Sequence, residues 1–122
     1  MSTKTVQKTA LRALALSLAI NSCFALAKDF TEKDFQSQPL GHGVYELAYD
    51  KGQQAIYAAS APSFDKDKTA GMVFLLNADT LKISDKIATE RRTFAVSLDE
   101  ENHILYLGNA LEGSIALLDT RT

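Results

Sequence analysis

The sequence contains an internal repeat of short strand-like segments. Residues 45–57 match residues 94–106 class by class at an offset of 49, and residues 71–77 match residues 113–119 at an offset of 42. The difference of seven residues corresponds to a longer loop in the first copy. Repeats of about 40 to 50 residues built from short strands are typical of β-propeller blades, which bury their faces only by stacking on neighbours. The pattern therefore predicts an all-β chain of stacked blades.

A basic and then apolar segment precedes the repeat. Three basic residues lead into an apolar run, and a short alanine-rich segment follows it (Lys4, Lys8 and Arg12; residues 13–20; residues 25–27). This order predicts a secretory signal peptide over residues 1–27. The apolar run is shorter than the roughly 20 residues that a membrane-spanning helix needs. We therefore expect export, cleavage before residue 28 and no membrane span in the mature chain.

Cleavage would change both the charge and the cysteine content. Cys23 is the only cysteine and would be removed, so we expect no disulfide; lipid anchoring at Cys23 is a minor alternative. Of the 122 residues, 95 remain after residue 27, with ten basic residues against 15 acidic ones and a net charge of −5. Such a charge opposes nonspecific attachment to nucleic acid or anionic lipid.

Strand patterns begin after Gly43, and residues 28–43 form a polar lead-in with room for one helical turn. We expect strands over 44–49, 55–60, 72–77 and 81–87 in a first blade (about 44–88), and over 93–98, 104–108 and 114–119 in a second, incomplete blade (about 93–122). The strand at 72–77 is apolar throughout, as expected for a strand covered on both faces. Two blades make a poor core, so further blades are expected from the same, longer polypeptide.

Two segments carry a resemblance to a known family. Residues 104–109 followed by 113–120 resemble the YVTN-type β-propeller repeat, which runs aromatic, β-branched, any residue, Asn, and then a valine-rich strand that closes on Asp-Thr. Residues 41–49, placed after a signal peptide, look like the amino-terminal part of YncE-like periplasmic propeller proteins. The resemblance implies a periplasmic propeller of about seven four-stranded antiparallel blades, of which this chain holds about one and three-quarters.

Three residues are candidate ligand contacts. His42 lies between two glycines just before the first strand, where the inner strands of propellers open toward the central channel; an ordinary loop histidine is the alternative. Arg91 and Arg92 precede the inner strand of the second copy, where they would face an anionic ligand with Tyr45 or Phe94 nearby for stacking. The longer loop of the first copy, residues 61–70, is a further place where a partner would be recognised.

Other polar residues favour structural roles. Asp50 and Asp99 recur at one position of both copies, and Asn77 and Asp119 recur at another, which indicates hydrogen bonding in turns rather than catalysis. His103 is expected to be solvated. Alternating carboxylates in residues 65–69 begin like a calcium loop, but the glycine and the final glutamate of that motif are missing. No zinc, dinucleotide, Walker or Ser-His-Asp motif occurs in the sequence.

These patterns favour a binding or scaffold protein without catalysis, cofactor or metal, whose ligand is a protein, a metabolite or a polymer. Two alternatives remain open. Related-looking propellers serve redox enzymes, so the chain would be part of a quinoprotein or a haem-dependent subunit. Alternatively, a basic rim with aromatic side chains would bind single-stranded nucleic acid, which requires that the other blades be more basic.

Overall fold

The structure is a computed structural model that describes residues 28–41, 43–65 and 70–121. The chain divides into two compact units, Met1–Phe35 and Gln36–Thr122. The described part of the first unit contains one turn of 3₁₀ helix, η1 (Glu32–Asp34). Its Asp34 carboxylate accepts hydrogen bonds from the Thr31 N–H (2.9 Å) and pairs with the Lys28 ammonium (2.7 Å). The signal-peptide prediction for residues 1–27 lies outside the described residues.

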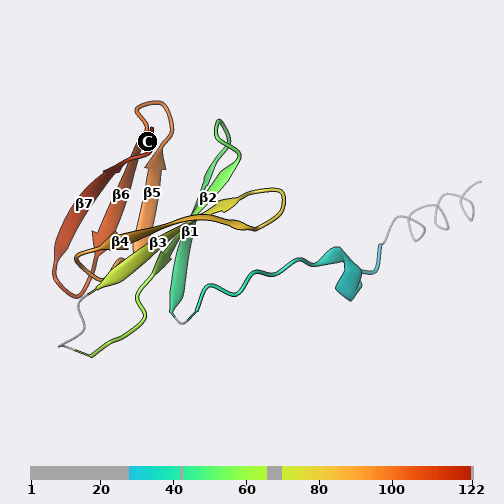
Figure 1. Ribbon diagram of the computed structural model, residues 1–122, viewed down its shortest axis with the longest axis horizontal. Coiled ribbons are helices and arrows are strands. Elements are labelled where there is room, and N and C mark those ends of the chain that lie inside the picture. The colour runs from blue at the N-terminus through green and yellow to red at the C-terminus, as the bar shows by residue number, and fades with distance from the viewer. Residues whose placement is uncertain (1–27, 42, 66–69, 122) are drawn as a thin grey trace, which may run out of the picture. The chain divides into compact units, whose positions relative to one another are not determined.

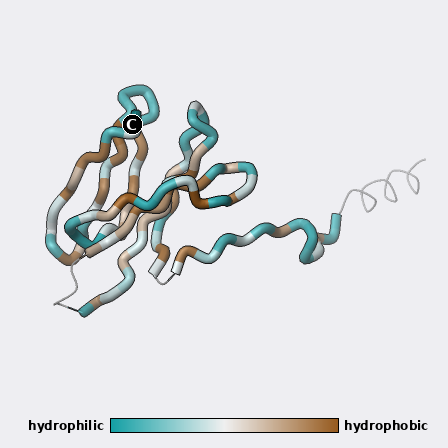
Figure 2. The backbone as a smooth tube through the Cα atoms, in the orientation of Figure 1, coloured by the Kyte–Doolittle hydropathy of each residue, from teal (hydrophilic) through white to brown (hydrophobic). Residues whose placement is uncertain are grey.

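The described part of the second unit forms two antiparallel sheets, with strand orders β1-β2-β3-β4 and β5-β6-β7 (Figure 1). The strands are β1 (Val44–Asp50), β2 (Ala55–Ser60), β3 (Gly71–Asn77), β4 (Ile83–Thr89), β5 (Ala95–Asp99), β6 (Ile104–Asn109) and β7 (Ser114–Asp119). Apolar residues concentrate on the strands and polar ones on the turns (Figure 2). The all-β prediction is confirmed, and sheets of four and three antiparallel strands are consistent with partial propeller blades.

The strand limits follow the predicted ones closely, with two late starts. β4 begins at residue 83 rather than 81, and β5 begins at Ala95 rather than at residue 93. For β4 the reason is a turn that includes Leu81, whose φ is +56° and whose N–H donates to the Asn77 carbonyl (2.9 Å). The Asn77 side-chain oxygen also accepts from the N–H groups of Asp79 (3.0 Å) and Thr80 (2.9 Å). The predicted turn role of Asn77 is therefore confirmed.

The aspartates that recur in the two copies also hold turns. Asp50 accepts from the Gln53 N–H (2.8 Å) and side-chain amide (3.1 Å), and Asp99 accepts in the same way from Asn102 (3.1 and 2.8 Å). The Asn102 amide and N–H hold the pKa of the Asp99 carboxyl below its usual value. These two carboxylates thus have the structural role that their recurrence predicts.

The repeat extends to unusual backbone conformations. Gln54 and His103, 49 residues apart, both have positive φ angles, +52° and +58°. The carbonyl of Gln54 accepts from the Ala78 N–H, and that of His103 accepts from the Thr120 N–H, both at 2.9 Å. Ala78 and Thr120 are 42 residues apart, so both offsets of the sequence repeat are offsets of the hydrogen-bonding pattern. The two sheets are therefore copies of one structural unit.

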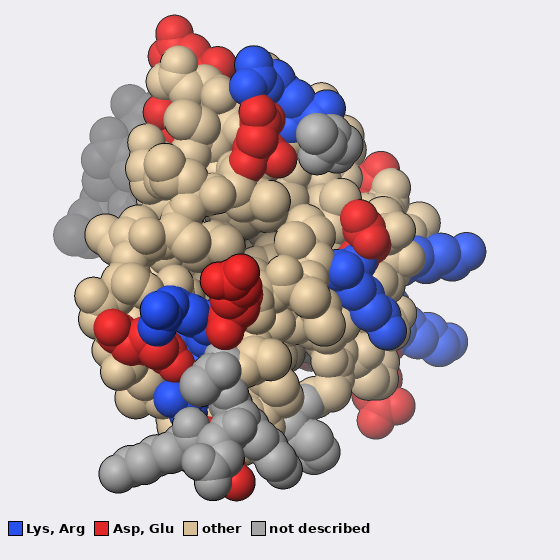
Figure 3. Space-filling model, turned by 60° about the vertical axis from the view of Figure 1, so that its left-hand side comes forward, with Lys and Arg blue, Asp and Glu red and all other residues tan. Residues whose placement is uncertain are grey.

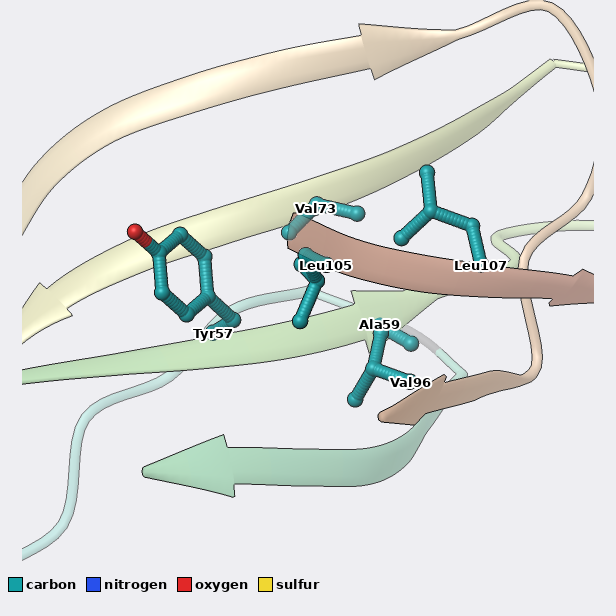
Figure 4. Packing of buried hydrophobic residues seen from close by; sticks show 6 residues of the cluster. All are labelled: Tyr57, Ala59, Val73, Val96, Leu105 and Leu107. Carbon is teal, nitrogen blue, oxygen red and sulfur yellow. The ribbon is translucent and has the colours of Figure 1, made fainter. Parts of the chain in front are cut away.

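The main core lies between the two sheets (Figure 4). It consists of three residues from each sheet, which point toward one another: Tyr57, Ala59 and Val73, and Val96, Leu105 and Leu107. Leu105 is fully buried in this core, and burial raises the pKa of the Tyr57 hydroxyl. A smaller cluster on the other side of the first sheet contains Phe74 and Leu76, against which Leu40 of the lead-in packs.

Hydrogen bonds reinforce the packing where the first strands of the two sheets are neighbours. The Glu46 carboxylate on β1 accepts from the Val96 N–H on β5 (2.8 Å). At the far end of these strands, the Glu100 carboxylate accepts from the Gly52 N–H (2.7 Å). The two sheets are thus fixed along β1 and β5, where both carry their first strand.

Candidate functional site

Because the strands are antiparallel, the connections that lead into β1, β3, β5 and β7 all lie at one end of the two sheets, which we call the loop end. Gly43 shows how tightly the chain is held there. Its N–H-bearing backbone has a φ of +72°, and its carbonyl accepts from the Ala61 N–H (3.0 Å). A Cβ at this position would lie 2.3 Å from the Ala61 carbonyl oxygen, so only glycine fits. The approach to β1 is therefore fixed against the start of the longer loop.

Three aromatic rings meet at the loop end, and we call them the aromatic cluster: Tyr45 on β1, Phe64 in the longer loop and Phe94 before β5. The ring centroids of Tyr45 and Phe94 are 4.7 Å apart, those of Tyr45 and Phe64 are 6.1 Å apart, and those of Phe64 and Phe94 are 5.8 Å apart. Such contacts are favourable aromatic pairs. Yet Phe64 is 65% exposed and Tyr45 is 43% exposed. The cluster is therefore ordered by its own packing and still accessible.

A buried ion pair lies next to the aromatic cluster. Arg92 Nε is 2.9 Å from Glu112 Oε1, and both side chains are more than nine-tenths buried. A second guanidinium nitrogen, Nη1, donates to the main-chain carbonyl of Asp65 (3.1 Å), the residue that follows Phe64. Arg92 thus connects the longer loop of the first sheet to the β6–β7 turn of the second. This connection helps to hold Phe64 beside its aromatic partners.

A chain of side-chain hydrogen bonds joins the strands of the second sheet at the same end. The buried Asn109 accepts from the Thr93 hydroxyl (3.1 Å) and donates to the Ser114 hydroxyl (3.2 Å). Asn109 is the asparagine that carries the resemblance to the YVTN-type repeat. In this chain its amide links the start of β5, the end of β6 and the start of β7.

The structure places the candidate ligand contacts in different surroundings. Arg92 is engaged by Glu112, so a ligand would have to compete with a buried ion pair. Arg91 is exposed and, with Glu90, lines the rim of a cleft of about 280 Å³ between β4 and the β6–β7 part of the second sheet. His42 lies outside the described residues. The three assignments stay predictions, while the proposed neighbours Tyr45 and Phe94 do come together.

Sequence reasoning missed two members of this end of the molecule. Phe64 lies in the longer loop that was expected to carry specificity, but nothing in the sequence placed its ring on Tyr45. Glu112 is 20 residues from Arg92 and gave no signal of pairing. Both contacts depend on how the two sheets pack.

The described residues contain no group of three or more His, Cys, Asp or Glu side chains placed to hold a metal ion. His103 is exposed, as expected. Residues 66–69 of the calcium-like segment lie outside the described residues. No helix in the described part of the chain is long and apolar enough to cross a membrane.

Charge on the visible face of the molecule is mixed rather than concentrated. Figure 3 shows Lys and Arg side chains interspersed with Asp and Glu on a mainly uncharged surface. A strongly basic stripe, which is the usual electrostatic footprint of nucleic-acid binding, is not seen on this face.

The fold and the repeat define the class: an all-β chain built of sheets consistent with partial propeller blades. The chain is similar to the Uncharacterized protein YncE of Escherichia coli (strain K12), with 25% identity over 108 residues, 87% of this chain and 30% of that protein. It is also similar to the protein of the same description from Salmonella typhi, with 26% identity over 106 residues, 87% of this chain and 29% of that protein.

No family model matches the sequence. The chain spans about 30% of the length of the curated relatives that it matches. The similarity runs through both copies of the repeat, since it covers most of the chain.

Proposed function

We propose that this protein is a periplasmic binding protein in which propeller-type sheets act as the scaffold and the aromatic cluster at the loop end contacts the ligand. The observation that carries the proposal is the exposure of Phe64 and Tyr45 within an ordered cluster. Solvent-exposed aromatic rings that are held in place lose little entropy on binding and are frequent anchors of binding surfaces. The ligand would be a protein, a metabolite or a polymer that presents a flat apolar surface.

The proposal includes the YVTN-type and YncE-like assignments, the signal peptide and the periplasmic location. Under it the chain is the amino-terminal part of a longer propeller. It also includes the absence of catalysis, because no described group at the loop end is arranged as a nucleophile with its base. The alternative of a redox subunit makes a different prediction, since haem or quinone colours a protein. Absorbance of the purified protein between 350 and 600 nm distinguishes the two, and a coloured preparation would contradict the binding-only proposal.

Binding by the aromatic cluster can be tested with one probe from each ligand class: indole, a proline-rich decapeptide and maltohexaose. Each probe is titrated while the aromatic side-chain signals are followed by NMR. We expect at least one probe to shift the signals of Tyr45 and Phe64. Phe64→Ala should then weaken that binding by about 1 kcal/mol, or roughly fivefold.

Phe35→Ala is the matched control, because Phe35 is 69% exposed and Phe64 is 65% exposed. Equal weakening by both variants, or no shift with any of the three probes, would contradict the proposal. A labelled single-stranded oligonucleotide serves as a fourth probe. Binding that weakens steeply with salt would favour the nucleic-acid alternative instead.

A further inference from the structure

The two sheets pack through faces that are not equivalent. We call the side of β1–β4 that carries Tyr57, Ala59 and Val73 the front face, and the side of β5–β7 that carries Val96 and Leu105 the back face. The contact between the sheets is therefore front to back. Because the sheets are copies of one unit, each sheet also has the face that the other uses, and these two remaining faces do not contact each other.

The front face of the second sheet has the same apolar character as that of the first. Its positions form two rows across the strands, Ala95–Gly108–Ile115 and Ser97–Tyr106–Leu117. None of these residues is charged. Ile115 is 76% exposed, whereas Val73, its counterpart at an offset of 42, is fully buried. Leu117, the counterpart of Leu75, is 65% exposed.

The surface of this front face is hollowed as well as apolar. Gly108 has no side chain, and a shallow hollow of about 340 Å³ lies around it, lined also by Ala95 and Ile115. Such a hollow suits an aliphatic or aromatic side chain from a facing sheet. Contiguous exposed apolar surface of this kind marks an interaction site.

The back face of the first sheet is open along β1. Leu47 and Tyr49 are the counterparts of Val96 and Leu98, and they are 60% and 53% exposed. Further from β1, Leu40 of the lead-in packs on Phe74 and Leu76 and covers that part of the face. The available part of the back face is thus apolar and lies beside β1, as its counterpart in the second sheet lies beside β5.

We propose that two copies of this chain associate head to tail, with the front face of β5–β7 of one copy on the back face of β1–β4 of the next. One molecule carries both halves of this contact, and its own two sheets show that front and back faces fit. A contact between different surfaces of identical chains is heterologous and continues from copy to copy unless it closes into a ring. In a longer polypeptide a following blade would cover the same front face; in the 122-residue chain a second copy covers it.

The test uses two variants with opposite defects. The front variant, Ile115→Asp with Leu117→Asp, keeps its back face; the back variant, Leu47→Asp, keeps its front face. All three positions are exposed in the single chain, so circular dichroism should show unchanged folding. Sedimentation velocity from ~1 to ~100 μM protein measures association in the range of transient interfaces. The unmodified chain should grow in mass with concentration, and each variant should associate at least ~10-fold more weakly.

The mixture of the two variants decides the geometry. One intact front face and one intact back face remain, so a mixture should form a dimer and no larger species. Leu111→Asp in the β6–β7 turn, an exposed leucine outside both faces, should assemble like the unmodified chain. An unmodified chain that stays monomeric throughout overturns the proposal. So does a mixture that stays monomeric while the unmodified chain associates, because that result indicates a different interface.

Discussion

Substitution of Leu105 by alanine tests the assignment of the core between the sheets. Leu105 lies on β6, is fully buried and packs in the cluster that joins the two sheets. The change removes three carbons, a transfer term of about 2.4 kcal/mol at roughly 0.8 kcal/mol for each. A partly unrelaxed cavity adds to this, so we expect the free energy of unfolding to fall by about 3 kcal/mol. That is a large part of the stability of a chain of this size.

The matched control is Leu117→Ala, the same substitution on the neighbouring strand β7 at a position that is mostly exposed. It should change the free energy of unfolding by no more than about 0.5 kcal/mol. Urea unfolding followed by circular dichroism at about 1 μM protein keeps association small. With a slope near 2 kcal/mol per molar urea, Leu105→Ala should lower the midpoint by roughly 1.5 M. Equal shifts for the two variants would refute the assigned packing.

Two further predictions concern ionisable groups that packing has buried. Glu112→Ala should destabilise the protein by about 3 kcal/mol in urea unfolding, because it leaves the Arg92 guanidinium buried without its partner, whereas Glu100→Ala, which removes an exposed carboxylate, should cost at most about 1 kcal/mol. Equal costs would show that the ion pair is not desolvated. Burial raises the pKa of Tyr57, so the unfolded chain loses this proton first and stability should fall as the pH rises above about 10. Tyr57→Phe should reduce that alkaline loss and Tyr106→Phe, at the exposed counterpart, should not; pH-dependent thermal unfolding measures both, and an unchanged profile for Tyr57→Phe would contradict the reasoning.

The strands and turns were predictable because their signals are local. Alternating or continuous apolar residues set the strands, and the aspartates at 50 and 99 bond to groups only three residues away. The start of β4 was placed two residues early because Leu81 continues the apolar pattern. Its positive φ is imposed by the turn around Asn77, and an apolar pattern carries no information on φ.

The loop end was less predictable because its contacts join distant parts of the chain. Tyr45 and Phe94 were expected near the same ligand since both precede or begin inner strands of the two copies. Phe64 joins them only because the longer loop folds back, and the bond from Arg92 to the Asp65 carbonyl spans 27 residues. The sequence treated Arg92 as a surface cation, since arginine is usually exposed; its burial depends on a partner that sequence spacing does not reveal.

The comparison of equivalent positions separates what the sequence specifies from what a neighbour supplies. Tyr57 and Tyr106 occupy the same place in the repeat, as do Val73 and Ile115, yet the first of each pair is buried and the second is not. The difference cannot lie in the residues, since their apolar character is the same; it lies in the second sheet that covers Tyr57 and Val73. Keeping apolar residues at Tyr106 and Ile115 makes physical sense only if a sheet covers them as well. The environment of the first sheet therefore describes the partner that the second sheet needs.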